Sequence, residues 1–527
     1  MPATSVASRT PEVIHLSPAD NVCVAVQPLK AGQQLTVAGR TFAVEGLIKM
    51  GHKLAVAPIK KGAPVVKYGE TIGFAAEAIE PGQWVHIHNV LAPLFERQYE
   101  YATEIPADPT PITDRTFQGY RRADGRVGTR NYIAIISNVN CSASVSKYIA
   151  ARFDKSILAK FPNVDGVLPL VHKGGCGMQF GGDDHEQLNR TLAGFAEHPN
   201  VAAYVLIGLG CETASLPYLV DSRHLIEIKG LGGETIPTSG SNRAPVLVMQ
   251  DLGGTQKTVD EGLRRIHELL PRVNAVRRET VPASEVVLGL NCGGSDGNSG
   301  ITANPALGVA SDMLVAAGGT TVLAETSETY GCEQLLTKRS RTREVGERLV
   351  ERIRWWEKYA AMFGARLDNN PSTGNKEGGL TTIYEKSLGA MAKAGTTALN
   401  DVVLYGERIK SRGFVFMDTP GFDPVSVTGL VAGGCNVVCF TTGRGSCFGC
   451  KPTPSIKIAT NTPMYERMID DMDLDAGVIL SQGTPLAEVG KQIFDLVLEV
   501  ASGKKTKSEL HGIGEEEFAP WSIGPTL

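Results

Sequence analysis

No apolar run in the sequence approaches the roughly 20 residues that span a bilayer. Basic charge is not in excess either, because 52 Lys and Arg residues stand against 56 Asp and Glu residues, a formal net charge of -4. Such a chain has no global positive field to hold nucleic acid phosphates. Residues 1–20 contain no apolar stretch preceded by basic residues, so we expect no secretory signal. These absences predict a soluble cytoplasmic protein with no membrane or nucleic acid partner.

Two glycine motifs of nucleotide enzymes are also missing. No G-x-x-x-x-G-K-[ST] segment occurs, and the turns at Gly208–Gly210 and Gly293–Gly294 do not complete G-x-G-x-x-G. Glycine itself is abundant, at 59 of 527 residues, and much of it stands in short clusters. Because glycine lets backbone approach a ligand closely, these clusters favour a small anion held by N–H groups over a dinucleotide.

The length predicts several domains, at roughly 150 residues each. Apolar and polar residues alternate between glycine corners over 13–95, which predicts a small all-β domain. Three prolines within Tyr101–Phe117 make 96–117 an extended linker. Apolar runs alternate with amphipathic helices over 118–280 and 281–527, which predicts two α/β parts with mainly parallel, Rossmann-like sheets.

The individual elements follow from the same patterns. Three amphipathic segments predict helices, at 144–153, 184–198 and 259–273. A strand over 83–90 would place His86 and His88 on one face, because side chains alternate along a strand. Continuous apolar runs predict buried strands at 132–139, 166–172, 202–209, 286–291, 320–325, 413–418, 437–443, 455–460 and 477–482.

Ten cysteines in a cytoplasmic chain do not indicate disulfides, so each is core filler, metal ligand or reactive thiol. Cys141, Cys176 and Cys211 each follow a predicted strand and are spaced 35 residues apart, about one strand–helix–strand step. Cys292 follows a fourth strand. The alternative for each is a small buried apolar residue. Cys447 and Cys450 have metal-ligand spacing without a second pair, which favours a structural loop.

Other donor groups stand at the same strand ends, where open α/β sheets bind ligands. Glu325 and Glu328 follow the strand after Cys292. Mixed nitrogen, oxygen and sulfur donors suit iron or zinc better than calcium or magnesium. The candidate metal ligands are His172, Cys176, Cys211, Glu212, Cys292 and Asp296.

Six further motifs occur along the chain: Gly119–Asn131, Gly208–Glu212, Cys292–Asp296, Thr302–Pro305, Pro371–Lys376 and Phe440–Gly445. Together, and in this order, they resemble the altronate and galactarate dehydratase family. Within 13–95, Gly51–Lys53, Lys67–Gly69 and Val85–Asn89 resemble the family's SAF-type β-clip domain. The resemblance covers nearly the whole chain and is closer to the altronate branch than to the galactarate branch.

The resemblance implies a hydro-lyase that converts a sugar acid into a 2-keto-3-deoxy acid with a divalent metal, Fe(2+) or alternatively Mn(2+). Such a reaction needs a base for the proton beside the carboxylate and a cation for the developing negative charge. Two other hypotheses stay open. One is an iron–sulfur dehydratase or redox protein with a [4Fe-4S] cluster on Cys141, Cys176 and Cys211. The other is a sugar-acid binding protein without catalysis.

Residue type suggests the remaining roles. The partners would be a small sugar acid and, as an open question, further copies of the chain in a homo-oligomer. Candidate catalytic residues are His52, His86, His88, His172 and Lys376. Candidate substrate-binding residues are Arg121, Arg130, Thr302, Asn304, Asn375, Lys376 and Arg444.

Overall fold

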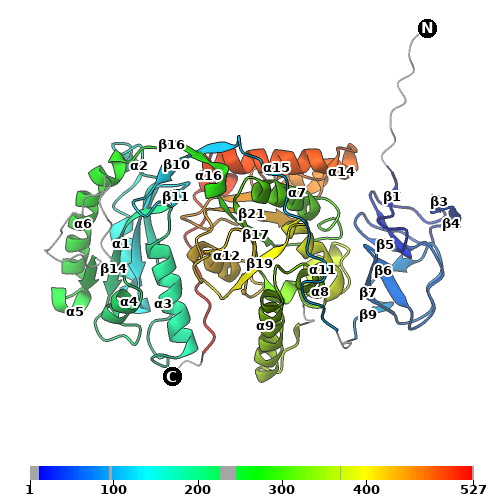
Figure 1. Ribbon diagram of the computed structural model, residues 1–527, viewed down its shortest axis with the longest axis horizontal. Coiled ribbons are helices and arrows are strands. Elements are labelled where there is room, and N and C mark those ends of the chain that lie inside the picture. The colour runs from blue at the N-terminus through cyan, green and yellow to red at the C-terminus, as the bar shows by residue number, and fades with distance from the viewer. Residues whose placement is uncertain (1–10, 94–97, 226–244, 368–369, 525–527) are drawn as a thin grey trace, which may run out of the picture.

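The computed structural model describes residues 11–93, 98–225, 245–367 and 370–524. A small β domain (residues 11–93) and a middle α/β domain lie at opposite ends of the molecule, with a larger C-terminal α/β domain between them (Figure 1). The predicted fold class is therefore confirmed. The predicted boundary at residues 95 and 96 and the chain end at 525–527 lie outside the described residues.

The β domain consists of short antiparallel strands joined by tight turns. Ala38 and Gly39 both have positive φ between paired Val37 and Arg40, as a two-residue hairpin turn requires. Its strands are β1 (Val13–Ile14), β2 (Val22–Ala25), β3 (Gln34–Val37), β4 (Arg40–Ala43), β5 (Lys53–Ala55), β6 (Pro64–Lys67), β7 (Glu70–Ala75), β8 (Trp84–Val85) and β9 (Val90–Leu91).

The predicted strand over 83–90 is wrong, because β8 ends at Val85 and residues 86–89 form a turn. The Asn89 side chain closes this turn by accepting from the His86 N–H and donating to the Trp84 carbonyl. Such asparagine hydrogen bonds compete with the strand ladder. His86 is consequently buried while His88 is exposed.

The middle domain has a four-stranded parallel sheet in the order β13-β12-β14-β15. Alternate residues of β12 face opposite layers: Ile133 and Ile135 pack with α1 and α6, and Ala134 and Ile136 pack with α3. The elements are β12 (Tyr132–Ser137), η1 (Asn140–Ser142), α1 (Ala143–Ala150), α2 (Lys155–Leu158), β13 (Gly166–Leu170), α3 (Asp183–Ala196), β14 (Val201–Gly208), α4 (Leu216–Ser222), β15 (Val246–Val248), α5 (Met249–Leu252) and α6 (Thr255–Ala275).

A small antiparallel sheet lies where the chain enters and leaves the middle domain. β10 (Thr116–Arg121) enters the domain and pairs with β16 (Glu279–Pro282), which leaves it, and with β11 (Val127–Gly128). Segments before and after the domain are thus hydrogen-bonded to each other.

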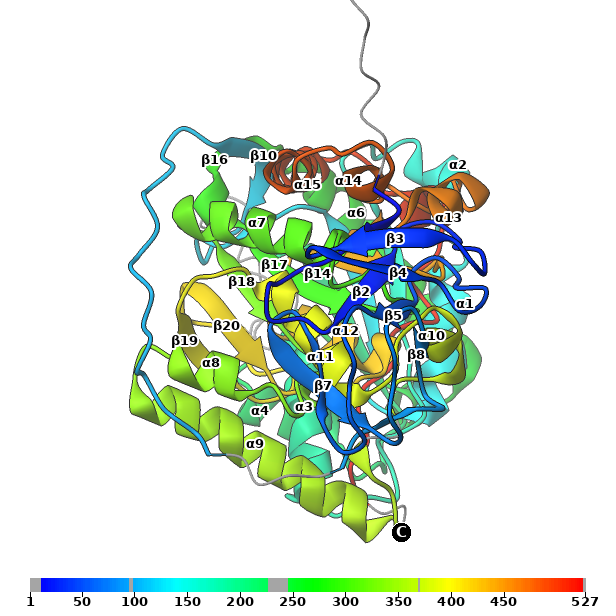
Figure 2. The same ribbon diagram turned by 90° about the vertical axis from the view of Figure 1, so that its right-hand side faces the viewer.

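The C-terminal domain has a seven-stranded parallel sheet in the order β19-β20-β18-β17-β21-β22-β23. α7 and α15 pack together over it, and α12 packs against both β17 and α3 of the middle domain (Figures 1 and 2). The strands are β17 (Val287–Cys292), β18 (Thr320–Leu323), β19 (Leu399–Val403), β20 (Gly413–Met417), β21 (Val437–Thr442), β22 (Ser455–Ala459) and β23 (Leu474–Asp475).

The predicted strand at 477–482 is wrong, because these residues form the short helix α14 (Val478–Ser481). A short apolar run does not by itself separate a buried strand from a buried helix. None of the helices in the described ranges has the length and apolar composition of a membrane span. The other helices are η2 (Ala283–Glu285), α7 (Ala303–Ala316), η3 (Thr326–Glu328), α8 (Gln334–Lys338), α9 (Arg343–Met362), α10 (Thr373–Glu377), α11 (Ile383–Met391), η5 (Ala392–Ala394), α12 (Asp423–Ala432), α13 (Thr462–Arg467), α15 (Leu486–Ala501) and α16 (Lys507–His511).

Candidate active site

The strand order of the C-terminal sheet reverses between β17 and β21. The chain leaves β17 toward β18 on one side, and later crosses back to place β21 on the other side. Open α/β sheets bind their ligands beyond the carboxyl ends of the strands at such a point. The segments there are the loop 293–299 after β17 and the loop 443–446 after β21.

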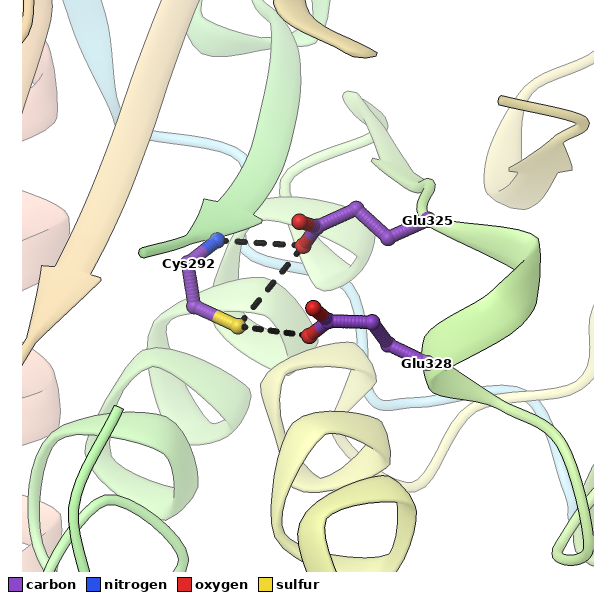
Figure 3. A group of neighbouring side chains, drawn as sticks. All are labelled: Cys292, Glu325 and Glu328. Atoms are coloured by element: carbon purple, nitrogen blue, oxygen red, sulfur yellow. Dashed lines mark hydrogen bonds between the residues drawn. The ribbon is translucent and has the colours of Figure 1, made fainter. Parts of the chain in front are cut away.

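A buried carboxylate–thiol cluster (Cys292, Glu325 and Glu328) occupies this edge of the sheet (Figure 3). The Cys292 Sγ lies 3.6 Å from the Glu325 Oε2 and 3.5 Å from the Glu328 Oε2. The three residues are at most 2% exposed. Among the described residues, this is the one group of three or more His, Cys, Asp or Glu whose ligand atoms all lie within 4.8 Å of each other.

Glu325 is held in an unusual conformation. Its φ of 68° lies in the left-handed region, which costs a non-glycine residue on the order of 1–3 kcal/mol. The Thr419 Oγ1 accepts from the Glu325 N–H at 2.8 Å, and the Cys292 N–H donates to the Glu325 Oε2 at 3.1 Å. The Glu325 Oε1 is buried and has no hydrogen-bond partner among the described residues. One carboxylate oxygen is therefore free to accept a ligand.

Two buried lysines neutralise the cluster. The Lys393 Nζ lies 2.9 Å from the Cys292 Sγ and 3.1 Å from the Glu325 Oε2. The Lys386 Nζ lies 2.5 Å from the Glu328 Oε1. Two ammonium groups thus face two carboxylates, which lowers the cost of burying all four charges.

The surroundings give the carboxyl groups different pKa values. Burial raises the pKa of Glu325 to about 7, and the nearby Glu328 carboxylate adds to this rise. Burial also acts on Glu328, but Lys386 and Lys393 hold its pKa below the usual value. Asp423 has a pKa raised to about 8, by burial first and then by Glu325 and Glu328. Perturbed carboxyl groups gathered at one strand edge are typical of functional sites.

A histidine–tryptophan group (His52, Trp84, His86 and His88) from the β domain covers the same edge. The Trp84 Nε1–H donates to the His52 Nδ1 at 3.2 Å, so the His52 Nε2 carries the proton and donates to the Glu377 carbonyl at 3.1 Å. The rings of Trp84 and His86 stack at 4.9 Å, and those of Trp84 and His88 lie 5.1 Å apart. Three predicted catalytic histidines are thus in one group.

His86 differs from His52 in having a free nitrogen. Its Nδ1 is buried without a partner among the described residues. Burial, and then the charge of Lys53, lowers the pKa of His86 to about 3, so the ring is neutral at physiological pH. A neutral ring with an unshared nitrogen can accept a hydrogen bond from a ligand.

Glycines allow the β domain to approach the sheet edge closely. A Cβ on Gly297 would lie 1.9 Å from the Gly51 carbonyl oxygen, and one on Gly379 would lie 2.3 Å from it. The Gly297 N–H also donates to the Gly378 carbonyl at 2.8 Å. The segments 51–53, 297–299 and 375–379 therefore pack backbone against backbone.

The predicted substrate-binding residues near this edge are Asn375, Lys376 and Arg444. Asn375 completes the capping box of α10 with the N-cap residue Ser372, and its side chain donates to the Ser295 carbonyl at 2.8 Å. Lys376 is half-buried beside it, and Arg444 is exposed 3.4 Å from the Glu377 carboxylate. Two cationic side chains thus flank the segment that contacts His52.

Asp296, Thr302 and Asn304 lie at the same edge but are occupied by hydrogen bonds within the protein. The Asp296 carboxylate accepts from Thr460, Ser299 and Asn461 side chains. Thr302 donates to the Thr460 carbonyl at 2.7 Å, and Asn304 accepts from the Thr441 hydroxyl at 2.6 Å. These residues shape the loops around the edge.

Arg121 and Arg130 lie away from this edge. Arg121 is in β10 and pairs with Glu279 at 2.5 Å on the surface. Arg130 is fully buried, and its guanidinium donates to both Glu509 oxygens and to the Val500 carbonyl. The structure gives both side chains pairing partners within the fold.

Four predicted metal ligands lie in the middle domain, apart from Cys292. Both His172 nitrogens are used, since Nε2 donates to the Ser137 carbonyl and Nδ1 accepts from the Gly174 N–H. Burial lowers the His172 pKa to about 4. The Glu212 carboxylate accepts from Asn138 and from the Gly210 N–H. Cys176 and Cys211 are exposed free thiols.

Sequence reasoning noted Glu325 and Glu328 but gave them no role, and it missed Lys386 and Lys393. Both glutamates follow β18, and the sequence of β18 does not show that this strand lies beside β17. The lysines are seven residues apart, which puts them on one side of α11 and η5. This spacing was the available signal, although most lysines in such a pattern are solvated.

Comparison with known proteins covers almost the whole chain. Three family descriptions match in order: "Altronate/galactarate dehydratase SAF domain" over 11–93, "D-galactarate dehydratase/Altronate hydrolase, second domain" over 119–274, and "D-galactarate/Altronate dehydratase, C-terminal" over 283–526. The chain is 36% identical over 517 residues to altronate dehydratases of Bacillus subtilis and Escherichia coli, covering 98% of this chain and 99% and 100% of theirs. It is 37% identical over 504 residues to galactarate dehydratase (L-threo-forming) of Escherichia coli, covering 93% of each chain.

Proposed function

The chain belongs to the D-galactarate/altronate dehydratase family, and on that premise we propose D-altronate as the type of its substrate. Its reaction is the dehydration of a sugar acid, so it is a carbon–oxygen lyase. The two altronate dehydratases align with 98% of this chain and with 99% and 100% of their own length. Galactarate, an acid with a carboxylate at each end, is the alternative.

Dehydration of such an acid breaks two bonds on neighbouring carbons. A base takes the proton beside the carboxylate, and the electron pair left behind expels the hydroxyl group from the next carbon as water after protonation. The resulting enol tautomerises to the 2-keto-3-deoxy acid. The site must therefore accept one proton, supply one to the leaving hydroxyl, and stabilise negative charge on the carboxylate.

The observation that carries the proposal is the meeting of distant segments at one sheet edge. The family-like segments that contain Gly51, Asp296, Lys376 and Arg444 come from two domains and from separate parts of the chain. They pack together through the Gly51–Gly297 contact and the Arg444–Glu377 pair. Residues that share one edge can act on one small substrate.

The donor types of the carboxylate–thiol cluster suit a divalent metal, which would compete there with the ammonium groups of Lys386 and Lys393. It offers one sulfur and two carboxylates from Cys292, Glu325 and Glu328, and the Glu325 Oε1 is buried without a partner among the described residues. The thiol favours Fe(2+) over Mn(2+), because sulfur is a softer ligand than manganese prefers. An ion bound there supplies Lewis acidity to a carboxylate or hydroxyl oxygen.

The chain's own side chains then divide the remaining work. Lys376 and Arg444 bind the substrate carboxylate through charge-assisted hydrogen bonds. The free Nδ1 of His86 accepts a hydrogen bond from the substrate. His52 positions the Glu377 segment, because both of its nitrogens are already engaged.

A substrate panel tests the proposal. The reduced, Fe(2+)-loaded protein is incubated with hexonates and hexarates, and 2-keto-3-deoxy acid is measured with a carbonyl-specific reagent. We expect turnover of altronate above the other acids. Turnover of galactarate without altronate would overturn the substrate assignment, and stabilisation by an acid without product would point to a binding protein.

A further inference from the structure

We propose that Cys141, Cys176 and Cys211 form a thiol rim on the middle domain that binds an iron–sulfur cluster. This site lies in a different domain from the carboxylate–thiol cluster and goes beyond the dehydration proposed above. It would be a second inorganic centre of the protein, with three thiolate ligands from η1 and two loops. One iron of a four-iron cluster would then lack a protein thiolate.

The three segments of the thiol rim are in direct main-chain contact. The Asn140 N–H, beside Cys141, donates to the Gly174 carbonyl at 3.0 Å. The Gly175 carbonyl, beside Cys176, accepts from the Ala214 N–H at 3.0 Å. The loop that carries Cys211 is thereby hydrogen-bonded to the loop that carries Cys176, which in turn is bonded to η1 with Cys141.

Gly175 shows how closely these loops are packed. Its φ is 98°, and a Cβ there would lie 2.3 Å from the Asn138 carbonyl oxygen and 2.7 Å from the Val139 Cα. Glycine is therefore required at the position directly before Cys176. The close approach holds Cys176 next to the end of β12, from which Cys141 follows.

The rim lies where the topology of the middle sheet predicts a ligand. The chain passes from β12 to β13 on one side and then crosses to β14 on the other side. The helices α1 and α3 that make these connections lie on opposite faces of the sheet. The carboxyl ends of β12 and β14 thus form the switch point at which open α/β sheets bind ligands. Cys141 and Cys211 follow those two strands.

Exposure distinguishes these thiols from ordinary core cysteines. Free cysteine is among the residue types most often buried. Cys141, Cys176 and Cys211 are all exposed and free, whereas six of the ten cysteines are buried. The only other exposed thiol, Cys447, is not at the end of a strand of this sheet. Three exposed thiols at one sheet edge therefore need an explanation other than packing.

The sulfurs of the thiol rim do not all lie within 4.8 Å of one another, which favours a cluster over a single ion. Zinc–sulfur bonds of about 2.3 Å keep two thiolates on one ion within about 4.6 Å of each other. The described residues contain one group with all its ligand atoms within 4.8 Å, and that group does not include the rim thiols. A cluster of several irons bonds each thiolate to a different iron and so spans a wider separation.

The support beneath the rim is built from buried polar groups. Asn138 is 0% exposed and donates to the Glu212 Oε1 at 2.8 Å and to the Ala214 carbonyl at 2.6 Å. These bonds fix its amide orientation and leave the Asn138 Oδ1 buried without a partner among the described residues. An orphaned polar atom at this depth indicates a missing ligand or ordered water.

The rim also shares a hydrophobic core with the loop after β21. Met178, two residues after Cys176, and Phe448, four residues after Arg444, belong to the same buried cluster. The thiol rim and the loop of Arg444 are therefore positioned by one core.

Reconstitution of the full-length protein tests the site. The reduced protein is incubated without oxygen with equal amounts of Fe(2+) and Fe(3+) and with inorganic sulfide, excess reagents are removed, and iron and acid-labile sulfide are measured per chain. We expect about four of each, with a brown chromophore and a paramagnetic signal after one-electron reduction. Protein that gains iron without labile sulfide, or gains neither, would overturn the proposal.

Single substitutions locate the ligands. Cys141→Ala, Cys176→Ala and Cys211→Ala should each lower the labile sulfide at least several-fold, and Cys23→Ala, in β2 of the β domain, should not. Unchanged melting temperatures would show that the variants fold. Full sulfide retention in any of the three rim variants would remove that thiol from the ligands and so refute the three-thiolate site. Glu328→Gln should keep the sulfide, so failure of the carboxylate–thiol cluster and failure of the rim are distinguishable.

Discussion

Lys53 of the β domain and Glu385 of α11 form an ion pair of 2.9 Å in which neither side chain is exposed. The second Glu385 oxygen pairs with Lys67, also at 2.9 Å, and the Lys53 Nζ donates to the Gly379 carbonyl at 2.7 Å. Two cations of one domain thus meet one carboxylate of another in a dry contact. This contact fixes the histidine–tryptophan group over the sheet edge.

Glu385→Gln should weaken the docking of the β domain. The change leaves Lys53 and Lys67 buried without a negative partner, and loss of one member of a buried pair costs about 3–5 kcal/mol. Urea unfolding measures this loss. Glu279→Gln is the matched control, because its pair with Arg121 is exposed and such pairs contribute about 0–1 kcal/mol. Equal losses in the two variants would contradict the docking role.

Cys292→Ser and Glu328→Gln should lower both bound Fe(2+) and turnover. Each removes one donor of the carboxylate–thiol cluster, and changes even to groups behind metal ligands reduce affinity by about 10- to 100-fold. Metal analysis after dialysis gives the content. Cys439→Ala, at a buried thiol of β21, serves as the control. Full metal content in the Cys292 and Glu328 variants would exclude those donors as ligands.

Lys376→Met should raise KM more than it lowers kcat, by roughly 10- to 100-fold, because a carboxylate contact made in the bound substrate is lost. Initial rates over a range of substrate concentrations separate the two constants. Arg121→Met should leave both constants unchanged, since Arg121 pairs with Glu279 in β16. A larger effect at Arg121 than at Lys376 would place the substrate elsewhere.

His86→Asn should lower kcat, whereas the same change at exposed His88 should have a smaller effect. His86 has a free buried Nδ1, and loss of a hydrogen bond to the substrate costs about 0.5–1.5 kcal/mol, roughly 2- to 10-fold in rate. Single-turnover rates with saturating substrate give the comparison. Equal activity of the His86 variant and the unmodified protein would remove His86 from the substrate contacts.

Folding stability should decrease as pH falls below about 6.5, in part through His198. Burial lowers its pKa to about 3, and its ring is neutral between the Cys435 carbonyl and the Asn200 N–H. Below this pH the unfolded histidine, with a pKa of about 6.5, binds a proton, whereas the buried ring of the folded protein stays neutral. The folded state therefore loses roughly 2 kcal/mol from this residue at about pH 5.

Urea unfolding at about pH 5 and pH 8 measures this loss. His198→Gln should reduce the difference between the two pH values, whereas His511→Gln, on the surface, should not. A difference of the same size in the His198 variant would show that other groups account for the acid sensitivity.

The apolar runs predicted the parallel strands well, because a strand buried on both faces is apolar at consecutive residues. β12, β14, β17 and β21 all lie within their predicted segments or one residue beyond. The prediction failed at 477–482 and 83–90. In the second case one side chain, Asn89, closes a turn that the alternation of residues does not reveal.

The candidate site was less accessible to sequence reasoning. Cys211 and Cys292 both follow an apolar strand and adjoin glycine, so their local sequences look alike. Cys292 faces two carboxylates, whereas Cys211 is exposed and accepts from the Gln250 amide. The difference arises because β18, with Glu325 at its end, pairs directly with β17.

The sequence by itself determined the fold class, the order of the three domains and the family, because backbone preference and hydrophobic periodicity act between residues close in the chain. Only the tertiary structure decided which thiol meets which carboxylate and which histidine keeps a free nitrogen. Those outcomes depend on strand order, domain docking and burial, which are set by contacts between residues far apart in the chain.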